Sequence, residues 1–168
     1  MLRLGLLIVL VTALAACSAK SATSTGRVER VLDGDTIRLT DGRRIRLVQI
    51  DAPEEGGREC YAERATAELR RLTPQGSKVE LIADPKLDEV DRFGRLLRYV
   101  VADGRVVNVE LVERGAAAPW FFAGNRGRYA DRLLRAAHDA QGTRRGLWAA
   151  CRGAVLDPLH GLGSGPSD

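Results

Sequence analysis

Four acidic residues lie at the two ends of a short stretch of the chain, and an arginine lies between them. Asp33 and Asp35 precede the first of two apolar runs, and Asp51 and Glu54 follow the second, which contains Arg46. Carboxylate oxygens are the ligands that a hard cation such as calcium prefers. A cation held by Asp35 and Asp51 beside an arginine would form a site that receives an anion. We therefore expect the stretch 33–54 to be the centre of the chemistry.

One geometric condition follows from this assignment. Residues Arg43–Ile50 are predicted to form a strand, in which side chains alternate between the two faces. Strict alternation places Arg46 and Asp51 on opposite faces, although both must reach one anion. A bulge, or a turn at Asp51, is needed to bring them together.

Composition and charge restrict the class of protein only broadly. The chain has 168 residues, of which 45% are hydrophobic and 29% are charged, and its net charge is +4. These values are typical of one soluble domain that can bury a core. The positive charge favours an acidic partner, but charges of both signs alternate along the chain, so a solvated mixed surface explains it equally well.

The N-terminal residues predict export and a lipid anchor. Arg3 is followed by an apolar run over residues 4–16, long enough for the core of a signal peptide and too short to span a bilayer. The end of this run resembles the bacterial lipoprotein box, in which Cys17 is acylated. We expect residues 1–17 to be the signal and 18–26 a flexible tether to a membrane outside the cytoplasm. Secretion with Cys17 discarded or free is the alternative.

The two remaining cysteines form an even pair in a chain expected to be exported. A disulfide between Cys60 and Cys151 is the economical interpretation. In the chain-entropy description, this bond would stabilise the folded protein by roughly 4.6 kcal/mol, because it restricts the unfolded chain. Two free buried thiols are the alternative. A zinc site is not expected, because His138 and His160 are isolated and the cysteines lack metal-type spacing.

The pattern of the remaining chain predicts an α+β fold, a five-stranded OB-fold β-barrel with about three helices. The expected domain spans 27–152, and a disordered tail is expected over 153–168. The expected strands are 27–32, 36–39, 43–50, 79–82 and 96–101. The expected helices are 61–72, 107–113 and 129–140.

Four groups of residues, in one order, resemble the thermonuclease, or staphylococcal-nuclease-like, family. The groups are Asp33–Thr36, Arg46 with Asp51–Glu54, Asp91–Arg95, and Val107–Asn108 with Gly146–Trp148. The resemblance covers roughly residues 26–151. It implies an OB-fold and calcium-dependent cleavage of phosphodiester bonds in DNA and RNA.

The resemblance also implies roles for individual residues. The residues similar to the calcium ligands are Asp35, Asp51 and, through its main-chain carbonyl, Ala52. The residues similar to the catalytic ones are Arg46, Glu54 and Arg95. Asp33 is similar to an acidic neighbour that tunes the metal. Many family members have threonine in place of Ala52, and a main-chain ligand tolerates that change.

Aromatic side chains are the expected contacts for nucleic-acid bases. Trp120, Phe121 and Phe122 form a cluster in an otherwise aromatic-poor chain, and stacking on bases is worth about 1–3 kcal/mol for each base. Packing of these three against the helices is the alternative. Arg92 and Phe93 are expected to add a phosphate contact and a second stacking face.

Three hypotheses explain these patterns to different degrees. The first is a monomeric, calcium-dependent endonuclease that hydrolyses DNA and RNA with little sequence specificity, favouring flexible or single strands. The second is a barrel of the same kind that binds nucleic acid without cutting it. The third is a structural envelope lipoprotein whose barrel binds a protein partner, and it leaves the conjunction of acidic and basic motifs unexplained. For Arg46 and Arg95 themselves, the alternative to catalysis is a salt-bridge network on the barrel surface with Glu54 or Asp51.

Overall fold

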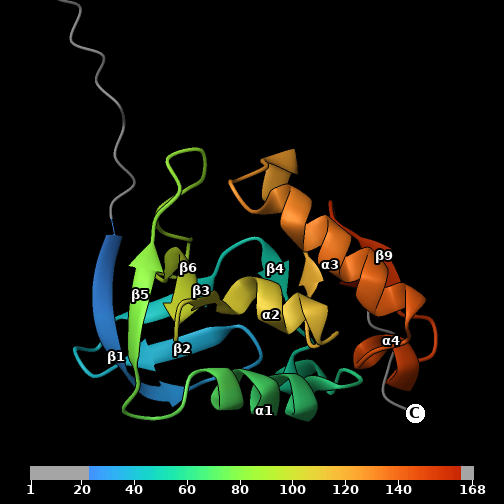
Figure 1. Ribbon diagram of the computed structural model, residues 1–168, viewed down its shortest axis with the longest axis horizontal. Coiled ribbons are helices and arrows are strands. Elements are labelled where there is room, and N and C mark those ends of the chain that lie inside the picture. The colour runs from blue at the N-terminus through green and yellow to red at the C-terminus, as the bar shows by residue number, and fades with distance from the viewer. Residues whose placement is uncertain (1–22, 164–168) are drawn as a thin grey trace, which may run out of the picture.

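Five short strands close into a barrel because the third strand pairs with the last. The computed structural model describes residues 23–163. The barrel strands are β1 (Thr23–Val31), β2 (Thr36–Leu39), β3 (Arg44–Leu47), β5 (Lys78–Ile82) and β6 (Leu96–Ala102). They follow the order β3-β2-β1-β5-β6, and parallel pairing of β3 with β6 completes the circle (Figure 1). The predicted α+β class and OB-type barrel are confirmed.

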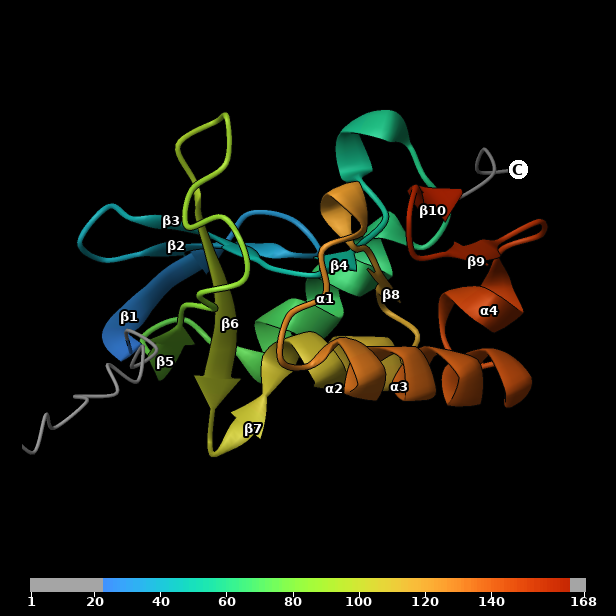
Figure 2. The same ribbon diagram turned by 90° about the horizontal axis from the view of Figure 1, so that it is seen from above.

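Helices cover one side of the barrel and extend the molecule beyond it. They are α1 (Ala62–Leu72), α2 (Val107–Glu113), α3 (Ala130–Gly142) and the short α4 (Leu147–Ala150). The barrel and α1 lie at one end of the molecule, and α3 and α4 lie at the other (Figures 1 and 2). Among residues 23–163, no helix combines the length and apolar character needed to cross a bilayer.

The amphipathic pattern of α1 shows why the helix packs where it does. Ala62, Ala65 and Leu69 recur at three- and four-residue intervals and are buried, and Ala65 and Leu69 belong to the main core. This spacing places them on one helical face. The predicted helices at 61–72, 107–113 and 129–140 are therefore present, each within two residues of its expected bounds.

The predicted continuous strand 43–50 is wrong in one respect that matters for the site. The chain leaves β3 after Leu47, turns at Val48 and Gln49, and resumes as β4 (Ile50–Asp51). Gln49 has a φ of 64°, in the left-handed region that interrupts a strand. β4 pairs with β8 (Ala118–Pro119) outside the barrel. This turn allows Arg46 and Asp51 to face the same side, which a continuous strand with alternating side chains would not allow.

A buried asparagine holds this turn against the barrel. Asn108 accepts a hydrogen bond from the backbone N–H of Val100 in β6 at 2.9 Å, and its side-chain amide donates to the carbonyl of Val48 at 2.9 Å. The Asn108 side chain thereby pairs two buried backbone groups that the end of β3 leaves without ladder partners.

Both ends of the predicted domain need correction. Residues 23–26, expected in the flexible tether, are paired with β5 as the first part of β1. Residues 155–163, expected in the disordered tail, form an antiparallel hairpin of β9 (Val155–Asp157) and β10 (Gly161–Gly163). β7 (Arg105–Val106) continues the barrel sheet after β6. The predicted signal and Cys17 lie outside the described residues.

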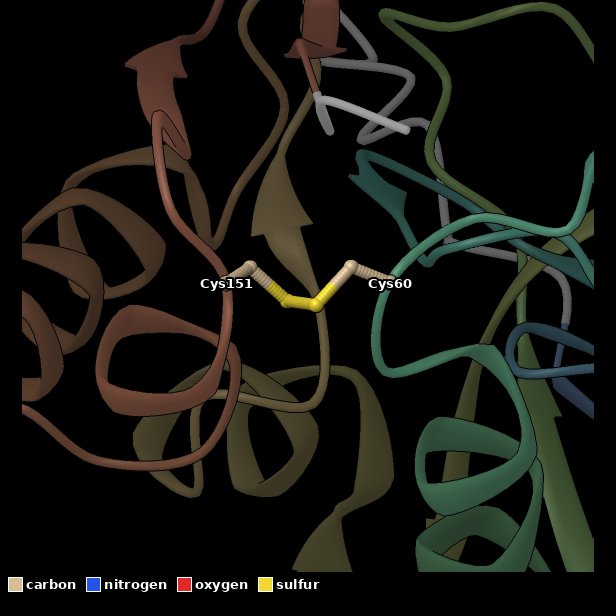
Figure 3. Close-up of a disulfide and its surroundings, with 2 residues drawn as sticks. All are labelled: Cys60 and Cys151. Atoms are coloured by element: carbon tan, nitrogen blue, oxygen red, sulfur yellow. A yellow bond between two sulfur atoms is a disulfide. The ribbon is translucent and has the colours of Figure 1, made fainter. Parts of the chain in front are cut away.

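A disulfide connects the loop before α1 to the end of α4. Cys60 and Cys151 are bonded, with their Cα atoms 5.7 Å apart (Figure 3). The prediction of this pairing is confirmed. The bond joins segments separated by 91 residues, so it ties the helical end of the molecule to the barrel end.

We predict that replacing both cysteines with serine lowers the free energy of unfolding by about 2–5 kcal/mol. The chain-entropy contribution of a loop of 91 residues is about 4.6 kcal/mol, and measured losses of native disulfides fall in the same range. Urea unfolding of the oxidised protein and of the double Cys60→Ser, Cys151→Ser variant measures the difference. A loss below about 0.5 kcal/mol would show that the bond does not constrain the unfolded chain.

Candidate active site at the rim of the barrel

Arg46 bonds to both of the aspartates predicted to hold a metal. Its Nε lies 3.0 Å from Asp35 Oδ1, and its Nη2 lies 3.2 Å from Asp51 Oδ1. Asp35 stands at the start of β2, Arg46 in β3 and Asp51 in β4, so two strands and the turn at Gln49 bring the three charges to one place. Arg46 and Asp35 are buried, whereas the side chain of Asp51 is 26% exposed.

The guanidinium of Arg46 is held by more than these carboxylates. Nη1 donates to the carbonyls of Leu47 and Ile50 at 2.8 and 2.7 Å, and the ring of Trp120 lies 5.8 Å from the guanidinium carbon. Four of the five guanidinium N–H groups thus have acceptors in the described part of the chain. Most of the Arg46 donors therefore bind protein oxygens, and the catalytic role of Arg46 stays a prediction.

The remaining oxygen of Asp35 contacts the loop that follows β4. The backbone N–H of Ala52 donates to Asp35 Oδ2 at 3.1 Å, and the hydroxyl of Thr36 donates to Oδ1 at 3.0 Å. Asp33 accepts from the N–H of Asp35 at 3.0 Å and so fixes the turn that presents it. Ala52 therefore lies beside the acidic pair, as predicted, and its observed contact is through its N–H.

The acidic pair carries more negative charge than Arg46 offsets. Burial, opposed by the charge of Arg46, raises the pKa of Asp35 to about 7, and the carboxylates of Asp33 and Asp51 add to the rise. Burial also raises the pKa of Asp51, against its hydrogen bond from Leu162 and the charge of Arg46, while the charge of Glu59 adds to the rise. A bound cation would relieve this cost.

These oxygens fit a hard divalent cation that keeps some of its water. Within residues 23–163, no three His, Cys, Asp or Glu side chains form a closed metal cluster. Two carboxylates from neighbouring elements are the donor set, and oxygen-only donors suit calcium or magnesium. The residues that would hold such an ion are Asp35, Asp51 and the main chain of Ala52.

Arg95 reaches the same rim from the loop before β6. Asp91 accepts from the N–H groups of Phe93 and Arg95 and from Arg95 Nε, the last at 2.6 Å. Burial disfavours ionisation of Asp91, but these bonds hold its pKa below the usual value. Arg95 Nη1 also lies 3.4 Å from the hydroxyl of Thr36, which in turn bonds Asp35. The turn therefore aims Arg95 at the acidic pair.

A cleft of about 450 Å³ joins both arginines to the predicted aromatic residues. Its walls include Arg46, Arg92, Phe93, Arg95, Trp120 and Phe122. Phe93 and Phe122 are more than half exposed. Phe121 is 3% exposed and packs in the core, so the predicted substrate contact is wrong for this residue. Phe121 lies between the end of β8 at Pro119 and the start of η2 (Phe122–Gly124) at Phe122.

Glu54 is the one predicted catalytic residue that the cleft does not include. It is exposed at the start of the turn η1 (Glu55–Gly57), just after Pro53. Its backbone N–H donates to Glu59 Oε2 at 2.8 Å, and the N–H of Glu59 donates back to its carbonyl at 3.2 Å. The loop therefore fixes the main chain of Glu54, and the catalytic role of its side chain stays a prediction.

Gln49 is a structural contributor to the site that sequence reasoning missed. Its amide donates to the carbonyl of Asn125 at 2.7 Å and accepts from the hydroxyl of Tyr99 and the N–H of Gly127 at 3.0 and 2.9 Å. Its own carbonyl accepts from the N–H of Trp120 at 3.0 Å. These bonds attach the aromatic wall, including η2 (Phe122–Gly124), to the turn beside Arg46. The available signal was a glutamine inside an apolar run.

A second missed contributor comes from the C-terminal hairpin. The backbone N–H of Leu162 donates to Asp51 Oδ2 at 3.0 Å. The donor is a main-chain group, so no side-chain pattern could have indicated it.

Comparison with known proteins gives a consistent result. Residues 44–150 match the staphylococcal nuclease homologue family. An uncharacterized endonuclease of Escherichia coli O157:H7 is 39% identical over 128 residues, covering 74% of this chain and 76% of that protein. Protein ParB of Escherichia coli is 37% identical, with 74% and 72% covered. The SPbeta prophage-derived endonuclease YokF of Bacillus subtilis is 31% identical, covering 77% of this chain and 45% of that protein.

The matched segment carries most of the rim described above: Arg46, Asp51, Arg95 and the aromatic wall all lie inside residues 44–150. A family match over most of the chain and a closed OB-type barrel agree with one another. The chain therefore belongs to the staphylococcal nuclease homologue family and is a nuclease, a hydrolase whose substrate is nucleic acid.

Proposed function

We propose that the chain is a calcium-dependent endonuclease that hydrolyses phosphodiester bonds in DNA and RNA with little sequence specificity. The observation that carries this proposal is the position of the Arg46 guanidinium. It bonds Asp35 and Asp51 and lines the cleft shared with Arg95. An anionic substrate in this cleft meets arginine beside a pair of carboxylates that can hold a cation.

In the proposed chemistry, the bound ion and the protein side chains have different roles. Calcium held by Asp35, Asp51 and the carbonyl of Ala52 would polarise a phosphoryl oxygen and neutralise charge. Arg95 donates hydrogen bonds to the phosphoryl oxygens as they gain charge in the transition state. Its side chain is 24% exposed and lies in the cleft, so it can reach a bound phosphate.

Arg46 acts mainly by positioning the acidic pair. Its buried contacts with Asp35 and Asp51 hold both carboxylates at the rim, and its remaining Nη2 N–H is available to the substrate. Glu54 is proposed to orient or deprotonate the attacking water. Water adds to phosphorus as its proton passes to Glu54, one P–O ester bond breaks, and the leaving oxygen takes a proton from solvent while Arg95 donates a hydrogen bond to it.

The aromatic side chains support the proposed preference for flexible or single strands. Phe93 and Phe122 present exposed rings on the cleft, and Trp120 packs edge-to-face on Phe122 with ring centroids 5.8 Å apart. Unpaired bases can leave a strand and stack on such rings, whereas bases inside a duplex cannot. We propose that this wall holds the bases next to the scissile phosphate.

We also propose that the protein works as a monomer anchored outside the cytoplasm by lipid on Cys17. The support is the N-terminal sequence, with its signal-like apolar run before Cys17. The disulfide between Cys60 and Cys151 is consistent with an oxidising compartment.

The first prediction concerns the requirement for calcium and for Arg95. Residues 18–168, which retain all of β1, should degrade single-stranded DNA with added calcium and stop when a chelator is added. Arg95→Ala should lower kcat about 10²–10³-fold, the usual loss when one transition-state donor is removed. Glu54→Gln should also lower kcat severely. Gel or fluorescence assays of cleavage measure these changes.

Arg135→Ala is the matched control, because Arg135 is exposed on α3 and does not line the cleft. It should cleave like the parent protein. If the folded parent protein binds single-stranded DNA in calcium but leaves it intact, the chain is the non-catalytic binding module instead.

The second prediction concerns the aromatic wall. Phe122→Ala should raise KM for single-stranded DNA about tenfold with kcat unchanged, because one stacked base is worth about 1–3 kcal/mol. Arg135→Ala, on α3 and outside the cleft, should change neither constant. With an abasic strand, the parent and Phe122→Ala proteins should become equal. A difference that persists on the abasic strand would contradict stacking.

The third prediction concerns the anchor. After expression of the whole chain in a bacterium, the mature protein should partition into detergent and carry lipid mass on an N-terminal Cys17. Cys17→Ala should move the protein to the aqueous phase. Recovery of the parent protein without lipid would support plain secretion.

A further inference from the structure

The C-terminal hairpin touches a proposed metal ligand although it lies outside the segment shared with the family. The family match ends at residue 150, whereas Leu162 of β10 donates its backbone N–H to Asp51 Oδ2 at 3.0 Å. β10 lies on the same side of the molecule as β4 and the loop before α1 (Figure 2). This chain therefore adds a contact that residues 44–150 do not contain.

The hairpin is fixed in place independently of that contact. The carbonyl of Pro158 accepts from the N–H of Phe121 at 2.6 Å, next to the aromatic wall. Leu156 and Leu162 pack against the cluster that contains Trp148 and Cys151. Asp157 accepts from the N–H of Leu159 at 3.0 Å and so shapes the turn between β9 and β10. The hairpin is therefore held by contacts other than the one to Asp51, so it can restrict the position of the Asp51 side chain.

Gly161 shows how closely the main chain approaches the carboxylate. It has a φ of 87°, and a Cβ built there would lie 2.8 Å from Asp51 Oδ2 and 3.7 Å from Trp120 Cδ1. A separation of 2.8 Å is below ordinary van der Waals contact. Only glycine allows β10 to pass Asp51 at this distance, because any side chain would push the carboxylate or the hairpin away.

We propose that the β9–β10 hairpin is a positioning element of the metal site, which holds Asp51 through the N–H of Leu162. The bond occupies Oδ2 and leaves Oδ1 on the side of Arg46 and Asp35. The Asp51 side chain is partly exposed, so without this donor it would sample other rotamers. The inference rests on the proposed function, in which Asp51 binds calcium.

The expected loss of calcium affinity is taken from comparable metal sites. Residues that orient a metal ligand through hydrogen bonds typically change metal affinity 10–100-fold when they are altered. Loss of the contact should therefore weaken calcium binding, while kcat at saturating calcium should change little.

Two glycines allow a matched experiment. Gly161→Ala should weaken calcium binding 10–100-fold, measured by isothermal titration calorimetry on residues 18–168. Gly153→Ala is the control: Gly153 also has positive φ, 76°, but a Cβ there meets nothing within 4 Å. Backbone strain is thus similar in the two variants, and only Gly161→Ala disturbs Asp51. Thermal melting confirms that both remain folded.

A second variant tests the same contact if Gly161→Ala does not fold. Deletion of residues 153–168 retains Cys151, and should weaken calcium binding to the same degree. Calcium affinity equal to or tighter than that of the parent, in either variant, would overturn the hairpin's role. If the parent binds no calcium, or if Asp51→Asn binds it equally well, the calcium assignment to Asp51 fails, and this inference fails with it.

Discussion

The site depends on one buried guanidinium that neutralises part of an acidic pair. Arg46 bonds Asp35 at 3.0 Å and Asp51 at 3.2 Å, in surroundings that bury Asp35 and leave Asp51 partly exposed. An unpaired buried charge would cost several kcal/mol, so the arginine permits the cluster to exist. Burial nevertheless raises the pKa of both aspartates, against the charge of Arg46. Two carboxylates share one guanidinium at this rim, and Arg95 lies beside them.

The geometry of the rim comes from one irregular residue. Gln49, with positive φ, ends the alternation of β3 and lets Asp51 come to the same side as Arg46. The side-chain oxygen of Gln49 also accepts hydrogen bonds from the Tyr99 hydroxyl and the Gly127 N–H. These bonds fix the aromatic loop next to the arginine. A strained backbone conformation is therefore maintained by the buried hydrogen bonds that surround it, as is common at functional sites.

The remaining parts of the molecule hold distant segments around this rim. The disulfide joins the loop after Glu54 to the end of α4, and the hairpin that follows reaches back to Asp51. The acidic pair, the aromatic wall and the C-terminal segment are thus linked through β4, which pairs with β8 just before Trp120. The closed barrel supplies rigidity, and the loops at its rim supply the chemistry.

The amino-acid sequence alone determined the strand and helix pattern of the barrel, the family resemblance, the disulfide pairing and the identity of Asp35, Asp51, Arg46 and Arg95 as rim residues. The strand and helix pattern follows from local periodicity, and the disulfide follows from an even pair of cysteines in a chain expected to be exported. The acidic residues stood out as charges at the ends of apolar runs, and Arg95 was indicated by the family resemblance. Only the tertiary structure decided that Phe121 turns inward, that most donors of Arg46 bind protein oxygens, and that Gln49 and the N–H of Leu162 support the site. The physical reason is that these properties depend on a backbone dihedral angle and on hydrogen bonds between residues up to 111 positions apart, and neither leaves a periodic trace in the chain.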